Sequence, residues 1–245
     1  MNDFVKACIA ANEEISDAIR NGFHASWYEK STVGAGGDVS SGLDLFAEEV
    51  FVKHLGAFGQ IDSEESGLVG EGNEKIIIDP IDGSSNALSL FPYFGSSVAK
   101  INAEGVLDAA IVCNFANGDI FIKTDTTKIQ QGKLYEEYYH TPYFSPAPEV
   151  GIFEKAYANP DVVAKLDEYH LKFRSPGAVA LSLAYAWSVN YVLYVGEFRI
   201  YDFAAGLALC EGLEVIVEED YVIVSKDKKI AEQIEMLVKN YKRIK

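Results

Sequence analysis

Apolar residues recur along residues 2–21 at the intervals of an amphipathic helix, and Asn21-Gly22 follows as a stop signal. These apolar residues share one helical face: Phe4, Ala7, Cys8, Ala11, Ile15, Ala18 and Ile19. The same spacing predicts a second helix from about 43 to 54. Residues 31–42, which lead into it, are rich in glycine and serine, so we expect a flexible loop there.

Short apolar runs predict the strands of the first half. The runs at 58–61 and 75–78 both end in acidic residues, so we expect strands whose carboxyl ends carry acids. Strand signals dominate from 95 to 123 and are interrupted at 103–105 and 116–119 by residues typical of hairpin turns. The first half is therefore predicted to be α+β.

The second half alternates helical and strand patterns. Helices are expected near 160–169, 177–186, 202–211 and at the end of the chain, and strands near 171–174, 191–195, 213–217 and 221–225. Such alternation favours an α/β arrangement. The proline-containing segment 141–149 is the best lobe boundary, which divides the chain into an N-terminal lobe, 1–142, and a C-terminal lobe, 143–245.

Composition narrows the class of partner. The 245 residues are 49% hydrophobic and 24% charged, as in an ordinary globular protein, and carry a formal net charge of −16. Because nucleic acids and anionic membrane surfaces are polyanions, this charge argues against binding either of them. It also presents a difficulty for a phosphorylated substrate, which would be repelled unless a cation intervenes.

The cysteines and a long segment without charged residues indicate where in the cell the protein is expected. Cys8, Cys113 and Cys210 are far apart, which fits a reducing compartment better than a disulfide scaffold. The segment 175–196 has no charged residue, but it contains Ser182, Ser188 and Asn190 and ends in a strand-like run, so we interpret it as a buried helix followed by a strand. With no signal-peptide pattern at the N-terminus, a cytoplasmic location is expected.

The most informative segment is Asp79-Pro80-Ile81-Asp82-Gly83-Ser84. A buried strand delivers Asp79 at its end, and Asp82 follows closely enough for both carboxylates to reach one cation. Gly83 permits an unusual backbone angle, and Ser84 stands where a helix would begin and offer backbone N–H groups to an anion. Acids that bind cations beside amides that bind anions suit a metal–phosphate site, although a capped helix after an Asp-Pro turn has the same pattern.

Three further acidic segments lie where the predicted elements begin or end: 37–44, 62–67 and 201–206. Each alone has an ordinary explanation. Asp44 would make a favourable acid–dipole contact in the first turn of a helix, 62–67 would be a solvated turn, and Asp202 would be a helix N-cap.

Together, the four segments resemble the inositol monophosphatase/fructose-1,6-bisphosphatase superfamily of Mg²⁺-dependent, lithium-sensitive phosphatases. The family's Gly-Asp-x-x-[Thr/Ser]-x-x-Asp is similar to residues 37–44 with a shifted hydroxyl, and its Glu-Glu-Ser to 64–66. Its Asp-Pro-Ile-Asp-Gly-[Thr/Ser] is similar to 79–84, and its [Trp/Tyr]-Asp-x-Ala-Ala-Gly to 201–206. Arg174–Ala178 resembles a segment that lines the family's substrate pocket, which brings Gly177 to the site. The resemblance implies a layered αβαβα sugar-phosphatase fold and a homodimer.

The resemblance also implies roles for individual residues. Two or three Mg²⁺ ions would be held by Glu64, Asp79, the carbonyl of Ile81, Asp82 and Asp202, with Asp79 bridging two ions. Glu65 would act through a water molecule, and Asp44 with Ser84 would orient and deprotonate the attacking water. The backbone amides of Gly83 and Ser84 would hold the phosphate.

The implied reaction is Mg²⁺-dependent hydrolysis, by metal-activated water, of a phosphate monoester of a small sugar or polyol: inositol monophosphate, fructose-1,6-bisphosphate or both. Inositol-specific members carry a glutamate seven residues before the acid at Asp202, where this chain has Val195, with Glu197 two residues later. Either the inositol contact is absent or the alignment shifts here. Arg199 would meet a second phosphate, or would be an ordinary surface arginine. The alternatives are a 3′-phosphoadenosine 5′-phosphate nucleotidase and a non-catalytic metal-binding regulatory protein.

Overall fold

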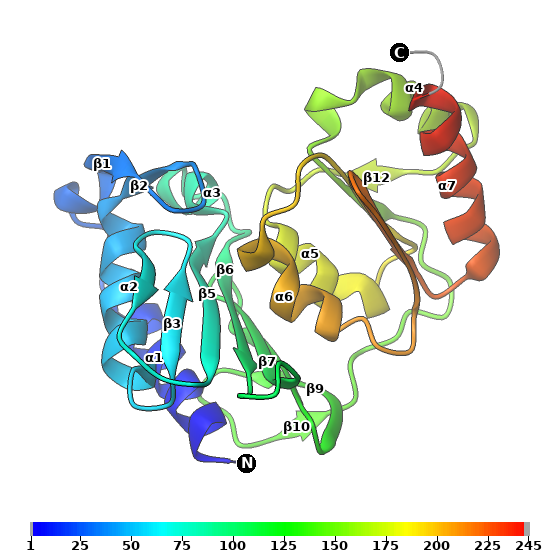
Figure 1. The fold of residues 1–245 in the computed structure, drawn as a ribbon. Helices are drawn as coiled ribbons and strands as arrows, with labels where there is room; N and C mark the ends of the chain where they lie inside the picture. The colour runs from blue at the N-terminus through cyan, green and yellow to red at the C-terminus, as the bar shows by residue number, and fades with distance from the viewer. Residues whose placement is uncertain (1, 243–245) are drawn as a thin grey trace.

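The computed structural model describes residues 2–242, which form five layers of helices and sheets (Figure 1). The first half comprises α1 (Asp3–Arg20), η1 (Ala25–Tyr28), β1 (Lys30–Val33), β2 (Val39–Ser41), α2 (Gly42–Leu55), β3 (Gln60–Ser63), β4 (Gly67–Val69), β5 (Lys75–Asp82), α3 (Ser84–Leu88), β6 (Gly95–Ile101), β7 (Leu107–Asn114), β8 (Asp119–Thr124), β9 (Thr127–Lys133) and β10 (Tyr139–His140). The second half comprises β11 (Gly151–Glu154), η2 (Ala156–Ala158), α4 (Pro160–Glu168), β12 (Phe173–Arg174), α5 (Val179–Ala184), η3 (Tyr185–Trp187), β13 (Val192–Val195), α6 (Ile200–Ala208), β14 (Glu214–Glu218), β15 (Tyr221–Ser225) and α7 (Lys228–Lys242).

Two sheets separate the three helical layers. The large sheet has the order β10-β9-β8-β7-β6-β5-β3-β4 and is antiparallel except where β3 runs parallel to β5. The small sheet has the order β12-β11-β13-β15-β14, and β11 is parallel to both of its neighbours. Helices α1 and α2 cover the outer face of the large sheet, α5 and α6 lie between the sheets, and α4 and α7 cover the outer face of the small one (Figure 1).

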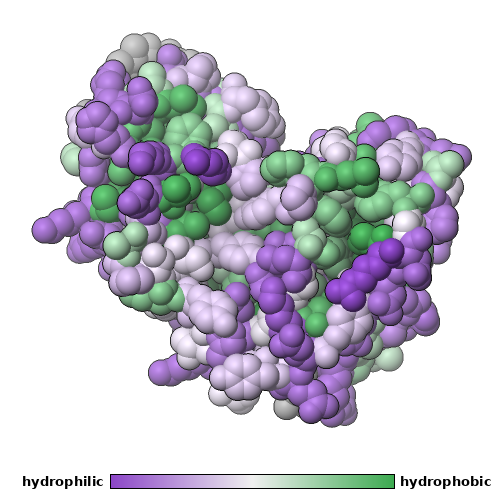
Figure 2. Space-filling view, turned by 180° about the vertical axis from the view of Figure 1, so that it is seen from behind, coloured by the Kyte–Doolittle hydropathy of each residue, from purple (hydrophilic) through white to green (hydrophobic). Residues whose placement is uncertain are grey.

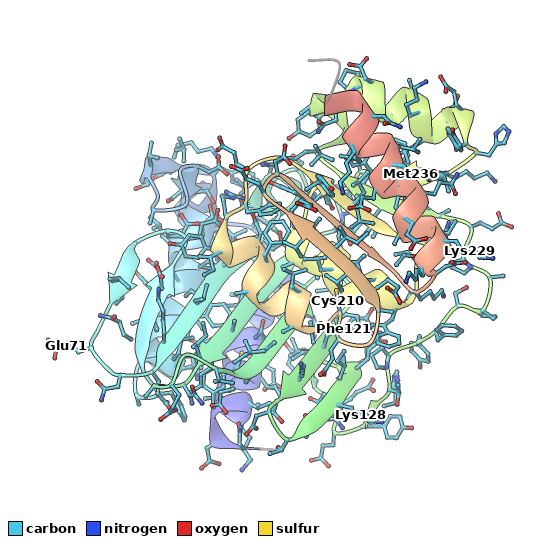
Figure 3. All side chains as sticks on the ribbon, turned by 45° about the vertical axis from the view of Figure 1, so that its right-hand side comes forward. Glu71, Phe121, Lys128, Cys210, Lys229 and Met236 are labelled. Carbon is cyan, nitrogen blue, oxygen red and sulfur yellow. The ribbon has the colours of Figure 1, made fainter. Side chains whose placement is uncertain are left out.

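The alternation of side chains along β5 explains how one strand serves two layers. Ile76 and Ile78 pack into the cluster that contains α1 and α2, whereas Ile77 packs into the cluster that contains α5 and α6. A strand that is buried on both faces reads as a continuous apolar run rather than an alternating one. Figure 3 shows the middle layer from the side: Phe121 of β8 packs where the large sheet meets α5 and α6, whereas Cys210, just beyond α6, packs in the cluster that includes the small sheet.

The predicted fold class is confirmed, and so are the helices expected at 2–21 and 43–54, which are α1 and α2. The flexible loop expected over 31–42 is wrong, since β1 and β2 pair there as an antiparallel hairpin. The loop between them is held by tertiary hydrogen bonds: Gly36 N–H donates to the carbonyl of Glu64 (2.7 Å) and Ala35 N–H to that of Glu65 (3.0 Å). Periodicity along the chain contains no trace of such contacts.

Two predicted helices have different bounds in the structure. The helix expected over 177–186 is the short α5, because Gly177 has φ +86° and Ala178 is extended, and its last turn tightens into η3. The helix expected from 202 begins at Ile200, so Asp202 lies inside its first turn and is not the predicted N-cap.

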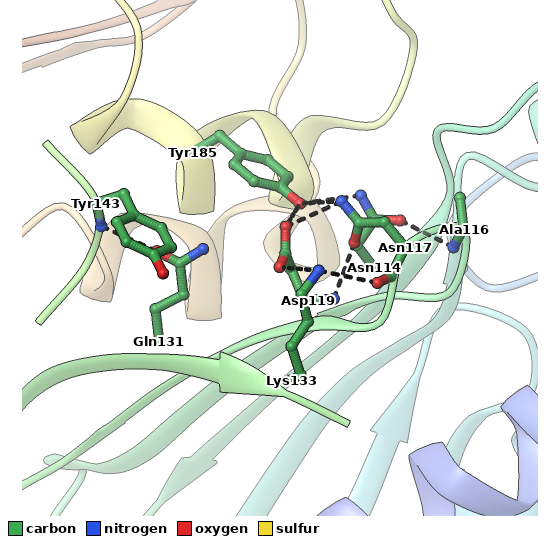
Figure 4. Close-up of polar contacts among 8 residues, drawn as sticks. All are labelled: Asn114, Ala116, Asn117, Asp119, Gln131, Lys133, Tyr143 and Tyr185. Carbon is green, nitrogen blue, oxygen red and sulfur yellow. Dashed lines mark hydrogen bonds and ion pairs between the residues drawn. The ribbon is translucent and has the colours of Figure 1, made fainter. Parts of the chain in front are cut away.

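The two halves meet through the middle helices. Tyr185 of η3 donates a hydrogen bond to Asp119 (2.6 Å) and accepts from Asn114 and Asn117 (3.1 Å each), all three on or beside the β7–β8 turn of the large sheet (Figure 4). Because α5 and α6 pack on both sheets, the division at 142/143 stays a prediction. Seen from behind, the surface is notched between the two halves (Figure 2). Among residues 2–242, no helix is long and apolar enough to cross a membrane.

Candidate functional site

A cavity of about 420 Å³ lies where strands of the large sheet end and helices α2, α3 and α6 begin. Every residue singled out from the sequence as catalytic, metal-binding or substrate-binding lines it: Asp44, Glu64, Glu65, Asp79, Ile81, Asp82, Gly83, Ser84, Gly177, Arg199 and Asp202. These residues span most of the chain, so the fold, and not sequence proximity, brings them together.

Three carboxylates form the centre of the cavity. Glu64, Asp79 and Asp202 each place one oxygen within 4.8 Å of the others, and their exposed fractions are only 9%, 3% and 1%. Burial and the neighbouring carboxylates of Glu64 and Asp82 raise the pKa of Asp79 well above its usual range. Burial also raises the pKa of Glu64 to about 7, against the opposing effect of Arg199. Carboxylates this close and this buried need a cation to stay ionised together.

A bulge in β5 presents the two aspartates of the central motif. Asp79 pairs with Ser97 of β6 and Asp82 with Gly95, so β5 has one residue more than its partner over this stretch, and Pro80 falls inside the irregularity. The Asp82 carboxylate accepts a hydrogen bond from the backbone N–H of Leu181 in α5 (2.8 Å). The motif therefore ties the large sheet to the middle helices.

Gly83 turns the chain from β5 into α3 with φ +85°, a conformation that disfavours any residue with a side chain. A Cβ at this position would lie 3.0 Å from the Ala178 Cβ and 3.2 Å from the carbonyl oxygen of Gly177. The glycine of the motif is thus required both by its backbone angle and by the close approach of the loop at Gly177.

Asp44 is held in a capping box at the start of α2. Its carboxylate accepts the backbone N–H and the hydroxyl of Ser41, both at 2.7 Å, while the Asp44 N–H points back to the Ser41 hydroxyl. The predicted acid in the first turn of the helix is confirmed. Burial raises the pKa of Asp44, and burial raises that of Glu65 to about 7 despite a hydrogen bond from Ser40.

Arg199 lies on the acidic centre. Its Nη1 contacts Asp38 and Glu64 (2.6 Å each), and its Nε and Nη2 contact the two carboxylate oxygens of Asp202 (2.9 and 3.3 Å). This guanidinium joins the β1–β2 hairpin, the end of β3 and the start of α6. The interpretation of Arg199 as an ordinary surface residue is therefore wrong.

The cavity also contains residues to which the sequence assigned no role. They include Asp38, Asn86, Glu154, Lys155 and Tyr157, whereas Ser175 and Pro176 belong to the segment expected to line the substrate pocket. Glu154 carried the same signal as Asp79, an acid at the carboxyl end of a buried strand. This strand, β11, was not predicted from the sequence, and no motif surrounds Glu154.

Known proteins of the same kind match most of the chain. A profile of the inositol monophosphatase family matches residues 2–219. A fructose-1,6-bisphosphatase/inositol-1-monophosphatase of Methanothermobacter thermautotrophicus is 30% identical over 80% of this chain and 74% of that protein. A bifunctional NADP phosphatase/NAD kinase of Methanocaldococcus jannaschii is 28% identical over 85% of this chain but only 43% of its own length.

The fold has counterparts among solved structures. The extragenic suppressor protein suhB from Bartonella henselae superposes with a TM-score of 0.79 at 19% identity, over 97% of this chain and 99% of that one. At this identity, the likeness concerns the fold alone. The family profile and the Methanothermobacter relative establish more, and the chain belongs to the inositol monophosphatase family, whose members are phosphoric monoester hydrolases.

Proposed function

We propose that this protein hydrolyses a phosphate monoester of a small sugar or polyol with the help of Mg²⁺. The observation that carries the proposal is the buried centre of Glu64, Asp79 and Asp202, set in one cavity with the Gly83–Ser84 turn. This arrangement combines oxygen ligands for a cation with backbone N–H groups for an anion.

The donor set fits Mg²⁺. All the ligands are oxygens, as this hard cation prefers, and the buried carboxylates lack enough cationic partners of their own. Glu64, Asp79 and the carbonyl of Ile81 would hold one ion, and Asp79, Asp82 and Asp202 a second. Such ions supply charge neutralisation at the phosphate and lower the pKa of a water molecule.

The protein's own groups would then position the reactants. The backbone N–H groups of Gly83 and Ser84 would hold the phosphate in the turn that the positive φ of Gly83 creates. Asp44, whose carboxylate is oriented by Ser41, would accept the proton of the attacking water with the Ser84 hydroxyl beside it, and Glu65 would act through water. Phosphoryl transfer needs mainly positioning and electrostatic stabilisation, so no protein nucleophile is required.

The substrate class is inositol monophosphate, fructose-1,6-bisphosphate or both, which agrees with the name of the Methanothermobacter relative. Val195 stands where inositol-specific members have a glutamate, and neither Val195 nor Glu197, two residues later, is among the residues that line the cavity, which favours fructose-1,6-bisphosphate. A contact between Arg199 and a second phosphate would require its guanidinium to leave at least one of the carboxylates it now pairs with. We also retain a homodimer and a cytoplasmic location as predictions.

The test is a comparison of kcat/KM for inositol-1-phosphate, fructose-1,6-bisphosphate and 3′-phosphoadenosine 5′-phosphate, with and without Mg²⁺. NADP belongs in the panel because the Methanocaldococcus relative is named for that substrate. We expect Mg²⁺-dependent release of phosphate, fastest from one of the first two esters. Absence of release from every ester would contradict the proposal and favour a non-catalytic metal-binding protein.

The contacts of Arg199 make a prediction about metal affinity. Arg199→Gln should lower the melting temperature in EDTA, because three carboxylates lose their partner, and should tighten Mg²⁺ binding by about tenfold. Both oxygens of Asp202 accept from the arginine, so a metal ion has to compete with the guanidinium for this carboxylate. Calorimetric titration with MgCl₂ measures the second effect. Arg20→Gln, at the end of α1, is the control, and unchanged or weaker Mg²⁺ binding by the Arg199 variant would contradict the argument.

A further inference from the structure

Glu154 is a buried acid in the cavity outside every segment that resembles the family. It ends β11 in the small sheet, with an exposed fraction of 1%, and it lines the cavity. A carboxylate buried this deeply is costly unless its oxygens are fully hydrogen-bonded. Its partners therefore indicate what it does.

All the partners of Glu154 belong to one loop and the helix after it. One carboxylate oxygen accepts the backbone N–H of Gly177 (2.9 Å). The other accepts the hydroxyl of Ser182 (2.5 Å) and, at 3.4 Å, the N–H of Ala178. The carboxylate thus fixes the N–H groups of the loop 175–178 and the start of α5.

Asn86 of α3 holds the same loop by its carbonyl groups. Its side-chain amide donates to the carbonyls of Pro176 (2.7 Å) and Gly177 (3.5 Å), and also to that of Tyr93 (2.7 Å). The loop is therefore clamped between an acid of the small sheet, which accepts its N–H groups, and an amide of the first half, which donates to its carbonyl groups.

The clamped loop packs directly against the Gly83–Ser84 turn, which we propose holds the phosphate. A Cβ at Gly83 would meet the Ala178 Cβ at 3.0 Å and the Gly177 carbonyl oxygen at 3.2 Å, and also the Tyr93 carbonyl oxygen at 3.1 Å. Asn86 itself lies only three residues after Gly83, and its backbone N–H donates to the Gly83 carbonyl (2.9 Å). A shift of the loop would change the surface against which Gly83 and Ser84 are set.

We infer that Glu154 is a positioning residue that, together with Asn86, fixes the loop 175–178 against the Gly83–Ser84 turn and so determines how tightly the phosphate group is held. The inference rests on the proposed function of this turn. Glu154 need not touch the substrate, because its oxygens are already occupied by the loop and by Ser182. Its charge matters for geometry, since only an ionised carboxylate has two acceptor oxygens and no donor to set against the N–H groups.

The test is Glu154→Gln, which keeps the size and shape of the side chain but places an NH₂ group against either the Gly177 N–H or the Ser182 hydroxyl, both of which now donate to the carboxylate. At saturating Mg²⁺ we expect KM and the dissociation constant for inorganic phosphate to rise by about tenfold, with kcat within about threefold of the wild type. Glu154 lines the cavity but is not a proposed ligand, so the variant should weaken Mg²⁺ binding far less than Asp79→Asn does, and saturating Mg²⁺ removes this effect from KM. Unchanged KM and phosphate affinity in the folded variant would overturn the inference, as would an effect confined to Mg²⁺ affinity.

Two further variants keep the test decisive. Asn86→Ala breaks the other side of the clamp and should raise KM and the phosphate dissociation constant in the same direction, so it answers the question even if the Glu154 variant does not fold. Glu149→Gln, an exposed acid on the segment that enters β11, is the matched control. If wild-type protein with Mg²⁺ neither binds phosphate nor releases it from any ester, the proposed function fails. If the wild type is active and both variants have its KM and phosphate affinity, the inference alone fails.

Discussion

Replacing Asp79 by asparagine is expected to lower kcat/KM by at least about a hundredfold, since metal charge stabilisation contributes several kcal/mol to phosphate hydrolysis. Asp79 stands between Glu64 and Asp82 and is the ligand proposed to serve both ions. A neutral amide keeps the size of the side chain but removes the charge that both ions would share. Steady-state kinetics with the best ester of the panel, at several Mg²⁺ concentrations, measures the effect.

The same substitution should not destabilise the metal-free protein. The pKa of Asp79 is raised by burial and by three neighbouring acids, so its ionised form opposes folding near neutral pH. In EDTA, Asp79→Asn should therefore unfold at the same or a higher temperature than the wild type, which separates loss of ligation from loss of fold. Asp167→Asn, near the end of α4, is the surface control. Near-wild-type kcat/KM in the Asp79 variant would refute the ligand assignment.

Much of the fold follows from local patterns that tertiary contacts reinforce. The apolar face of α1 and the isoleucines of β5 place these elements correctly, because burial on one helical face, or on both faces of a strand, leaves its period in the sequence. The start of α6 differs from the prediction because a local signal is overruled by a side-chain contact. Asp202 reads as a good N-cap, but it pairs with Arg199, and the helix begins two residues earlier.

The predicted site residues meet in one cavity because acids at strand ends and helix starts converge at one edge of the layers. What could not be predicted depends on partners distant in sequence. Glu154 accepts hydrogen bonds from a loop more than twenty residues further on, and Arg199 pairs with Asp38, which is 161 residues away in the sequence. Neither pairing leaves a periodic or motif-like signal.

Removing divalent metal is expected to weaken the binding of inorganic phosphate by at least about a hundredfold, because the phosphate loses the cations that would neutralise it and the acids that stay ionised repel it. Against the cationic side chains of Lys155 and Arg199, the cavity is lined by many acids: Asp38, Asp44, Glu64, Glu65, Asp79, Asp82, Glu154 and Asp202. Arg199 is already paired with three of them and has little charge to offer an anion. Equilibrium dialysis of phosphate in MgCl₂ and in EDTA measures the difference.

An uncharged polyol provides the control for this last experiment, since myo-inositol carries no charge for the acids to repel and its weak binding should depend far less on metal. The net charge of −16 then has a specific consequence: the acids that exclude an anion from the metal-free cavity are the ones proposed to recruit the cations that admit it. Equal phosphate affinity in EDTA and in Mg²⁺ would contradict this account. It would mean that Lys155, Arg199 and the backbone amides of the Gly83 turn suffice to hold the anion, and that the acidic centre serves another purpose.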